Sequence, residues 1–270
     1  MTLSTLRQPR NAYRLWARIH RRYVTTTEWV RMGRLSLEFT RIADPDRVLD
    51  EVANDVDLRE RLTGRRDDNH HLHLPYWAEL WDSALGVGQF LTKVRTDKGT
   101  RGPGDQGIRA AARSVSLSPC LPVPLSSPAS VLDLGCGMGL AGTVAAALGA
   151  RVLFADIEPS ALLFARLNSL PWASRVRTRR LDWRTDELAE TFDLILGADI
   201  LYERSQWEFL EPFWRRHLAR RGTVLIGEPG RQTGDLFPDW IARRGWRICV
   251  SEEQLATRQR PIRIFQLVTM

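Results

Sequence analysis

The sequence predicts an α/β fold built on a seven-stranded, mostly parallel sheet that ends in an antiparallel hairpin. From residue 130 onward, apolar runs of strand length alternate with amphipathic segments of helix length. The glycine-rich turn 133–139 (DLGCGMG) follows the first of these strands. The last two strands have no helix-length segment between them. Alternating strands and helices indicate a parallel sheet covered by helices, whereas a short connection indicates antiparallel pairing.

The elements of this region follow one another at regular intervals. We predict strands over 131–134, 151–157, 176–183, 192–198, 223–227, 246–251 and 262–268. We predict helices over 140–148, 159–170, 206–219 and 235–244. Gly149 and Gly222 each follow a helical pattern, the position at which glycine commonly ends a helix.

The first part of the chain predicts a shorter set of elements. A helix is expected over 12–24 and a strand over 35–42. Asp44-Pro45-Asp46 is typical of a helix start, and this helix should reach about Ala53. A second short helix is expected over 56–62. A further helix should place Trp77 and Trp81 on one face and run to about Leu91.

The order of the predicted helices and strands indicates that the chain has two parts. Residues 1–74 should form an N-terminal extension that packs on a catalytic domain at 75–270. Residues 96–128 are rich in Gly, Pro, Ser and Arg, which indicates a flexible insertion.

The net charge is +7, and only two of the 39 basic residues, Lys93 and Lys98, are lysines. A basic face for an acidic protein, RNA or a ribosomal partner is one interpretation. The charge is not confined to one block, so we favour an arginine-biased surface. Residues 7–22 carry six arginines and no acid, as in an organellar transit peptide or a basic helix lying on the domain, and we favour the helix.

No apolar run approaches the roughly 20 residues that span a bilayer, and the N-terminus lacks the apolar core of a secretory signal. We therefore expect a cytoplasmic protein without a membrane span, or one in an organellar matrix if the N-terminus is a transit peptide. His70, His71 and His73 lie close together, but no cysteine or carboxylate partner has a suitable spacing, and no CxxC pair occurs. We therefore predict no metal site.

The glycine turn predicts a ligand site, because its backbone can approach a ligand at the carboxyl ends of parallel strands. Asp133 precedes the first glycine by two residues, and Asp156 ends the next strand, where it can accept both hydroxyls of a ribose. A dinucleotide site would normally show GxGxxG with a pyrophosphate at the helix N-terminus. The alternating glycines and the charge of Asp133 favour S-adenosylmethionine, whose methionine part carries an ammonium group.

Asp182 and Trp183 end the third predicted strand. The carboxylate of Asp182 can accept from an adenine amino group while the indole of Trp183 packs on the ring. An edge tryptophan that caps the sheet is the alternative. The glycine turn and Asp156 also stand at strand ends, on the same edge of the predicted sheet. We therefore favour a role for Asp182 and Trp183 in binding the cofactor.

The sequence resembles the seven-β-strand protein-lysine methyltransferases, which are related to nicotinamide N-methyltransferase and include the electron-transfer-flavoprotein β-subunit lysine methyltransferase. The matching segments are PYWAELWDSA at 75–84, VLDLGCGMGLAG at 131–142, ADIEPSAL at 155–162, LDW at 181–183 and DILY at 199–202. The resemblance implies a Rossmann-like fold and an S-adenosylmethionine-dependent N-methyltransferase that acts on a protein lysine.

The resemblance also implies roles by position. The cofactor-binding residues would be Trp81, Asp133, Gly135, Cys136, Gly137, Gly139, Asp156, Asp182, Trp183 and the backbone of Ala198. Asp199 and Tyr202 would lie at the entry for the methyl acceptor. We hypothesise that Tyr202 helps to form a desolvating channel and that Asp199 orients the amine by a hydrogen bond. In the alternative, Asp199 caps the loop and Tyr202 only packs.

Other functions remain open at this stage. An enzyme that methylates amino groups of nucleic-acid bases would carry Asn-Pro-Pro-Tyr or a close variant where this chain has the proline-free segment 198–202 (ADILY). Base methylation is therefore disfavoured, although the basic charge keeps it as an alternative. A small-molecule N-methyltransferase is the nearer rival, and a non-enzymatic cofactor-binding scaffold is a third. We expect a monomer whose partner is an acidic, ribosomal or metabolic protein.

Overall fold

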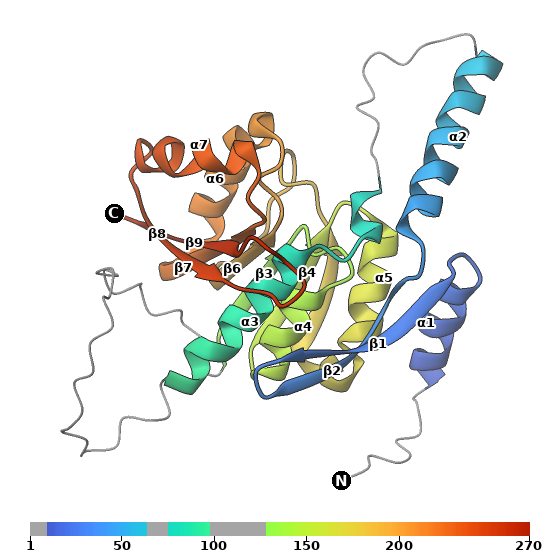
Figure 1. Ribbon diagram of the computed structural model, residues 1–270, viewed down its shortest axis with the longest axis horizontal. Helices are drawn as coiled ribbons and strands as arrows, with labels where there is room; N and C mark the ends of the chain where they lie inside the picture. Colours follow the sequence, from blue (N-terminus) through green and yellow to red (C-terminus); the bar gives the residue numbers. More distant parts are fainter. Residues whose placement is uncertain (1–9, 64–74, 98–127) are drawn as a thin grey trace.

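The computed structural model describes residues 10–63, 75–97 and 128–270 (Figure 1). Its centre is a seven-stranded sheet of order β5-β4-β3-β6-β7-β9-β8. The strands are β3 (Ser130–Leu134), β4 (Arg151–Asp156), β5 (Val176–Arg180), β6 (Phe192–Ala198), β7 (Leu218–Glu228), β8 (Trp246–Glu253) and β9 (Ile262–Thr269). Strands β3 to β7 are parallel, and β9 runs antiparallel to both β7 and β8. The predicted α/β fold with its terminal antiparallel hairpin is confirmed.

Successive side chains of the central strands point to opposite faces of the sheet, and each face has its own apolar core. Val131 and Leu194 belong to one core, whereas Leu132 and Ile195 belong to the other. Helices α3 (Asp82–Asp97), α4 (Leu140–Ala147) and α5 (Pro159–Asn168) cover the first face. Helices α6 (Trp207–His217) and α7 (Gln232–Ala242) cover the second, as Figure 1 shows. Three short 3-10 segments, η1 (Tyr76–Ala78), η2 (Leu170–Arg175) and η3 (Arg204–Gln206), complete this region.

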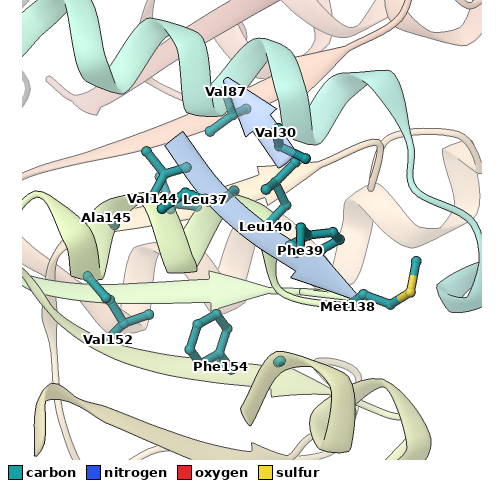
Figure 2. Packing of buried hydrophobic residues seen from close by; sticks show 14 of the residues in the cluster. Val30, Leu37, Phe39, Val87, Met138, Leu140, Val144, Ala145, Val152 and Phe154 are labelled. Atoms are coloured by element: carbon teal, nitrogen blue, oxygen red, sulfur yellow. The ribbon is translucent and has the colours of Figure 1, made fainter. Parts of the chain in front are cut away.

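An N-terminal hairpin lies on the first layer of helices. It consists of β1 (Thr25–Met32) and β2 (Leu35–Ile42), and it follows helix α1 (Arg10–His20). Figure 2 shows Val30 and Phe39 of the hairpin in one core with Val87 of α3 and Leu140 of α4. Burial of these apolar side chains, at about 25 cal/mol per Å² of apolar surface, holds the hairpin on α3 and α4. The predicted boundary near residue 74 and the insertion at 96–128 fall almost wholly outside the described residues and stay predictions.

Several predicted elements need correction. The strand β1 was missed, and the two predicted helices at 44–53 and 56–62 are one helix, α2 (Pro45–Thr63). Trp77 and Trp81 do not share a helix face, because η1 ends at Ala78 and α3 begins only at Asp82. Strand β5 ends at Arg180 rather than at Trp183, and β7 begins at Leu218 rather than at Thr223. The histidines at 70, 71 and 73 lie outside the described residues.

Candidate functional site

The carboxyl ends of β3, β4 and β6 meet at one edge of the sheet, together with the segment after β5. This edge carries the glycine turn after β3, Asp156 at the end of β4, Trp183 after β5 and Asp199 after β6. Parallel pairing places these strand ends side by side, and the chain order reverses direction between β3 and β6. A ligand crevice is expected at such a switch point. Four of the sequence-predicted positions are thus brought to one edge.

The glycine turn adopts a backbone that favours glycine. The φ angles of Gly135, Gly137 and Gly139 are 63°, 50° and 83°, all in the left-handed region. A Cβ atom at Gly135 would lie 3.0 Å from Cγ2 of Ile200 and 3.4 Å from Cζ3 of Trp183. The space above Gly135 is therefore narrow and is bordered by these two side chains. Cys136 between the glycines has a free thiol, and burial raises its pKa.

Asp133 lies behind the turn rather than at its surface, with only 1% of its area exposed. One carboxylate oxygen accepts the backbone N–H of Gly142 in the first turn of α4, at 2.8 Å. Burial raises the pKa of Asp133 to about 7. The structure therefore shows Asp133 joining β3 to the start of α4, and its approach to a ligand ammonium group stays a prediction.

Asp156 connects the same turn to β4. Its two carboxylate oxygens accept the N–H groups of Gly137, at 2.8 Å, and Glu158, at 2.9 Å. Burial raises its pKa to about 6, although the backbone hydrogen bonds act in the opposite direction. Each oxygen of a carboxylate has a second lone pair, so two ribose hydroxyls can still donate to Asp156.

Trp183 closes the site on the β5 side. Its indole lies next to Gly135, and Nε1 donates to the Gln206 side chain at 3.2 Å. Asp182 comes two residues after the end of β5, and its carboxylate accepts hydrogen bonds from the Arg184 guanidinium, the shortest at 2.7 Å. Neither Gln206 nor Arg184 was predicted as a neighbour of these two residues.

Asp199 has an unusual backbone for a non-glycine residue, with φ at 57°. Aspartate tolerates this region better than most residues, and strained backbone often occurs at functional sites. The carboxylate is buried and accepts two hydrogen bonds from Arg231, at 2.8 Å from Nε and 2.6 Å from Nη2. Burial raises the pKa of Asp199, while the Arg231 guanidinium opposes that rise. Asp199 is thus half of an ion pair that the sequence did not predict.

Three aromatic side chains form a group beside this ion pair. The Tyr76 ring lies edge-on to Trp81 and to Tyr202, with centroid distances of 6.3 and 5.7 Å. The Arg231 guanidinium lies 5.4 Å from the centre of the Trp81 ring, within the range of a cation–π contact. Nε1 of Trp81 donates to the Tyr76 carbonyl oxygen at 2.9 Å. Tyr202 is therefore part of an aromatic group, as its proposed role in a channel requires, although that role stays a prediction.

A pocket of about 370 Å³ opens beside these residues. It is lined by residues 79–83, by Asp199, by residues 229–231 and by Arg258. Trp81 belongs to this wall, so the structure places it next to Asp199 and Arg231. The tryptophan beside the glycine turn is Trp77, whose carbonyl oxygen lies 3.6 Å from a Cβ built at Gly137, and the cofactor contact expected of Trp81 stays a prediction. Ala198, predicted to close the cofactor pocket, ends β6 directly before Asp199 and pairs with Gly227.

The edge as a whole fits the groups of S-adenosylmethionine. The glycine turn offers backbone without Cβ atoms at close range, and Asp156 offers acceptor lone pairs for ribose hydroxyls. Trp183 offers an indole beside the turn. In the described part of the chain, no group of three or more His, Cys, Asp or Glu residues is arranged to hold a metal ion. In the same residues, no helix combines the length and apolarity of a membrane span.

Tyr76 and Arg231 were missed as site residues. Tyr76 lies in the same segment as Trp81, and its contacts depend on the short η1 turn. Arg231 follows Gly230, whose φ is 93°, in the turn after β7. It reaches Asp199 because β7 lies beside β6. A lone arginine among many, in a loop, carries no sequence signal for this contact.

The fold is that of the Rossmann-like methyltransferases. Magnesium protoporphyrin IX methyltransferase (ChlM) from Synechocystis PCC 6803, solved with bound S-adenosylmethionine, aligns over 85% of this chain and 98% of its own. The TM-score is 0.50 and the sequence identity 16%, so the similarity concerns the fold alone.

A family model described as lysine methyltransferase matches residues 76–236, more than half of the 270 residues. The chain therefore belongs to the lysine methyltransferase family, and the resemblance inferred from the sequence is confirmed. The matched region runs from Tyr76 to Leu236 and contains every residue predicted for the site.

Individual relatives agree with this assignment. The protein N-lysine methyltransferase METTL21A of Xenopus tropicalis is 41% identical over 104 residues, which cover 36% of this chain and 47% of the relative. The electron transfer flavoprotein beta subunit lysine methyltransferase of Xenopus laevis is 38% identical over 163 residues, which cover 58% of this chain and 53% of the relative. The chain thus spans about half the length of the curated relatives that it matches.

Proposed function

We propose that this protein is an S-adenosylmethionine-dependent methyltransferase that methylates a lysine side chain of a protein. The observation that carries the proposal is the meeting of two sites at one sheet edge. The glycine turn with Asp156 and Trp183 forms the first, and the Asp199 pocket, with Trp81 in its wall, forms the second. Family membership supports lysine as the acceptor.

When bound, S-adenosylmethionine would supply a methyl group on a positively charged sulfur. Asp156, Trp183 and the glycine turn would hold it. The lysine nitrogen, once its ammonium proton has gone to water, would accept that methyl group with its lone pair, and the electron pair of the broken C–S bond would stay with sulfur. Alignment of the two sites supplies much of the acceleration in such a displacement.

The protein must also favour a neutral acceptor. A free lysine side chain has a pKa of about 10.4, so only about one in a thousand is neutral near pH 7. Trp81 lines the pocket, and the rings of Tyr76 and Tyr202 continue the aromatic group outside it, so that a bound acceptor would lose part of its water, which favours the uncharged amine. Asp199 can accept a hydrogen bond from that amine and so direct its lone pair.

The first test is transfer of label from methyl-labelled S-adenosylmethionine into proteins of a cell lysate. We expect label in a protein band that releases methyl-lysine on hydrolysis. The chain itself has only Lys93 and Lys98, so a K93R/K98R double variant removes self-labelling as a source. Label in RNA or in a small-molecule fraction would instead identify one of the rival acceptors.

A matched variant separates the enzyme from a cofactor-binding scaffold. Asp199→Ala should bind S-adenosylhomocysteine with unchanged affinity in calorimetry, because Asp199 lies outside the glycine turn. Its labelling of the protein band should fall by tenfold or more, on the order of 1.4 kcal/mol of lost transition-state stabilisation. Equal labelling by both proteins would refute the role of Asp199, and no labelling by the wild type despite binding would favour the scaffold.

We also propose a monomer that acts in the cytoplasm, or in an organellar matrix, on an acidic, ribosomal or metabolic protein. The charge of +7 supports an acidic partner. Sedimentation of the purified chain and fractionation of cells that express it would test the oligomeric state and the location. Loss of lysate labelling with rising salt would support the charge argument.

A further inference from the structure

The Asp199 pocket contains a cation of its own. Arg231 donates from Nε and Nη2 to the two oxygens of Asp199, at 2.8 and 2.6 Å. The same guanidinium lies over the Trp81 ring at 5.4 Å from its centre. It therefore contacts both the carboxylate and the aromatic face on which an acceptor ammonium group would otherwise be stabilised.

The turn that carries Arg231 is held by a buried acid. Glu228 accepts the backbone N–H groups of Gly230, at 2.8 Å, and Arg231, at 2.6 Å. Arg263 donates to Glu228 at 2.6 Å and also bonds the Arg231 carbonyl oxygen at 3.3 Å. The Arg231 backbone is thus fixed from two sides, so its pairing with Asp199 is built into the fold.

Charge at the pocket depends strongly on this one residue. The pocket wall carries three carboxylates, on Glu79, Asp82 and Asp199, and two guanidinium groups, on Arg231 and Arg258. Glu228 and Tyr202 also face Asp199, and Arg258 pairs with Asp82 at 3.2 Å. Loss of Arg231 would leave three negative charges against one positive charge. Nearby negative charge stabilises a lysine in its protonated form, which cannot act as a nucleophile.

We propose that Arg231 is a positioning residue for methyl transfer: it neutralises and orients Asp199, so that this carboxylate accepts a hydrogen bond from a neutral acceptor amine without holding the amine protonated. This inference rests on the proposed function. It adds to the role proposed for Asp199: the carboxylate directs the amine as half of a neutral pair and not as an isolated anion.

The test compares Arg231→Gln, Arg231→Lys and wild type between pH 7 and 10. The substrate is the lysate protein that the wild type labels, purified, with saturating S-adenosylmethionine. If Arg231→Gln raises the pKa of the bound acceptor by one unit, kcat falls about tenfold near pH 7 and recovers toward pH 10. KM should stay equal or decrease, because the protonated acceptor binds better. Arg231→Lys keeps the charge but loses the two-point geometry, so its pH profile should stay nearer to the wild type.

The chain offers a closely matched control in Arg244. This guanidinium bonds both oxygens of Glu208, at 2.7 and 2.8 Å, and lies 3.7 Å from the centre of the Trp240 ring, outside the pocket. Arg244→Gln should leave the pH profile unchanged. The affinity for S-adenosylhomocysteine, measured by calorimetry, should be the same in all four proteins.

The outcomes separate the inference from the proposed function. A wild type that labels no protein at any pH overturns both. An active wild type with an Arg231→Gln profile that is unshifted, or lowered by the same factor at every pH, overturns only the role of Arg231. An equal shift in Arg244→Gln would also overturn it, because a general effect of losing an arginine would then explain the change.

Discussion

The side chain of Asn168 pairs with both backbone polar groups of Thr40. Its Oδ1 accepts the Thr40 N–H at 2.8 Å, and its Nδ2 donates to the Thr40 carbonyl oxygen at 3.0 Å. The same Nδ2 donates to the Met138 carbonyl oxygen in the glycine turn, also at 3.0 Å. One amide at the end of α5 therefore joins the N-terminal hairpin to the turn expected to bind the cofactor.

We predict that Asn168→Ala loosens this junction. The substitution leaves the part-buried backbone groups of Thr40 and the buried carbonyl oxygen of Met138 without their partner, which should lower the free energy of unfolding by about 2–4 kcal/mol. Urea unfolding measures the loss. Ser160→Ala is the control. It removes one hydrogen bond between Tyr23 and α5 but leaves every backbone group with its partner. An equal loss in both variants would show that the hairpin is held by its apolar core alone.

We predict that Gly135→Ala weakens cofactor binding. The added methyl group would lie 3.0 Å from Ile200, so that side chain must shift, and 3.4 Å from Trp183, in direct contact with the indole beside the turn. The left-handed φ of 63° adds a strain of about 1–2 kcal/mol. Gly245→Ala is the matched control, because its φ is 77° and a Cβ there meets no atom within 4 Å.

Both variants should lose stability in thermal unfolding, and Gly135→Ala should lose more because of its contact with Ile200. Only Gly135→Ala should lose affinity for S-adenosylhomocysteine, by tenfold or more in calorimetry. Unchanged affinity in Gly135→Ala would exclude Gly135 and the adjoining face of Trp183 from the binding surface.

Strands whose burial shows in their own residue pattern were predicted correctly, whereas a strand buried mainly by distant elements was not. Strands β2 and β6 were predicted at their observed bounds, because their alternating or continuous apolar residues record burial directly. Strand β1 was missed because only Val30 and Met32 of its eight residues are buried, and they are buried by a core formed with α3 and α4. Local propensity contains no information about that packing.

The site was predicted in part for a similar reason. The positions of Asp156 and Asp199 follow from strand ends, which sequence patterns locate. Their partners depend on three-dimensional neighbours: Arg231 lies 32 residues from Asp199, and Gln206 lies 23 residues from Trp183. The sequence thus identified where polar groups gather but not which charges they meet there.

The buried carboxyl of Asp133 makes stability depend on pH. Its pKa in the folded protein is about 7, above the value of about 3.9 in an unfolded chain. The folded state therefore holds the proton more tightly, and this stabilising contribution is fully present below about pH 4 and lost as the pH rises through about 7.

We predict that Asp133→Asn removes this dependence while keeping an oxygen for the Gly142 N–H. The free energy of unfolding of the wild type, minus that of the variant, should fall by up to about 1.4 kcal/mol per pH unit between pH 4 and 7. Urea midpoints of the two proteins across this range measure the difference. If the urea midpoints of the two proteins changed in parallel between pH 4 and 7, Asp133 would be ionised throughout this range, with a pKa near that of a free carboxyl.

Glu228 should be less tolerant of amide substitution than another buried acid of this protein. Both of its oxygens accept N–H groups, from Gly230 and Arg231, and Arg263 adds a further donor. In Glu228→Gln, the side-chain NH₂ must face one of these donors, so the turn that carries Arg231 should shift. Glu253 is the control: Lys93, at 2.6 Å, and Gln89, at 2.9 Å, both donate to its Oε2, so a glutamine can turn its oxygen toward them.

We predict that Glu228→Gln lowers the free energy of unfolding by about 2–4 kcal/mol, more than Glu253→Gln, because a buried donor is left opposed to another donor. Glu228→Gln should also reduce methyl transfer and shift its pH profile in the direction expected for Arg231→Gln, since Asp199 loses its aligned partner. Glu253→Gln should leave the profile in place. If Glu228→Gln lowered stability without moving the profile, the side chain of Arg231 would hold Asp199 without help from the backbone of its turn.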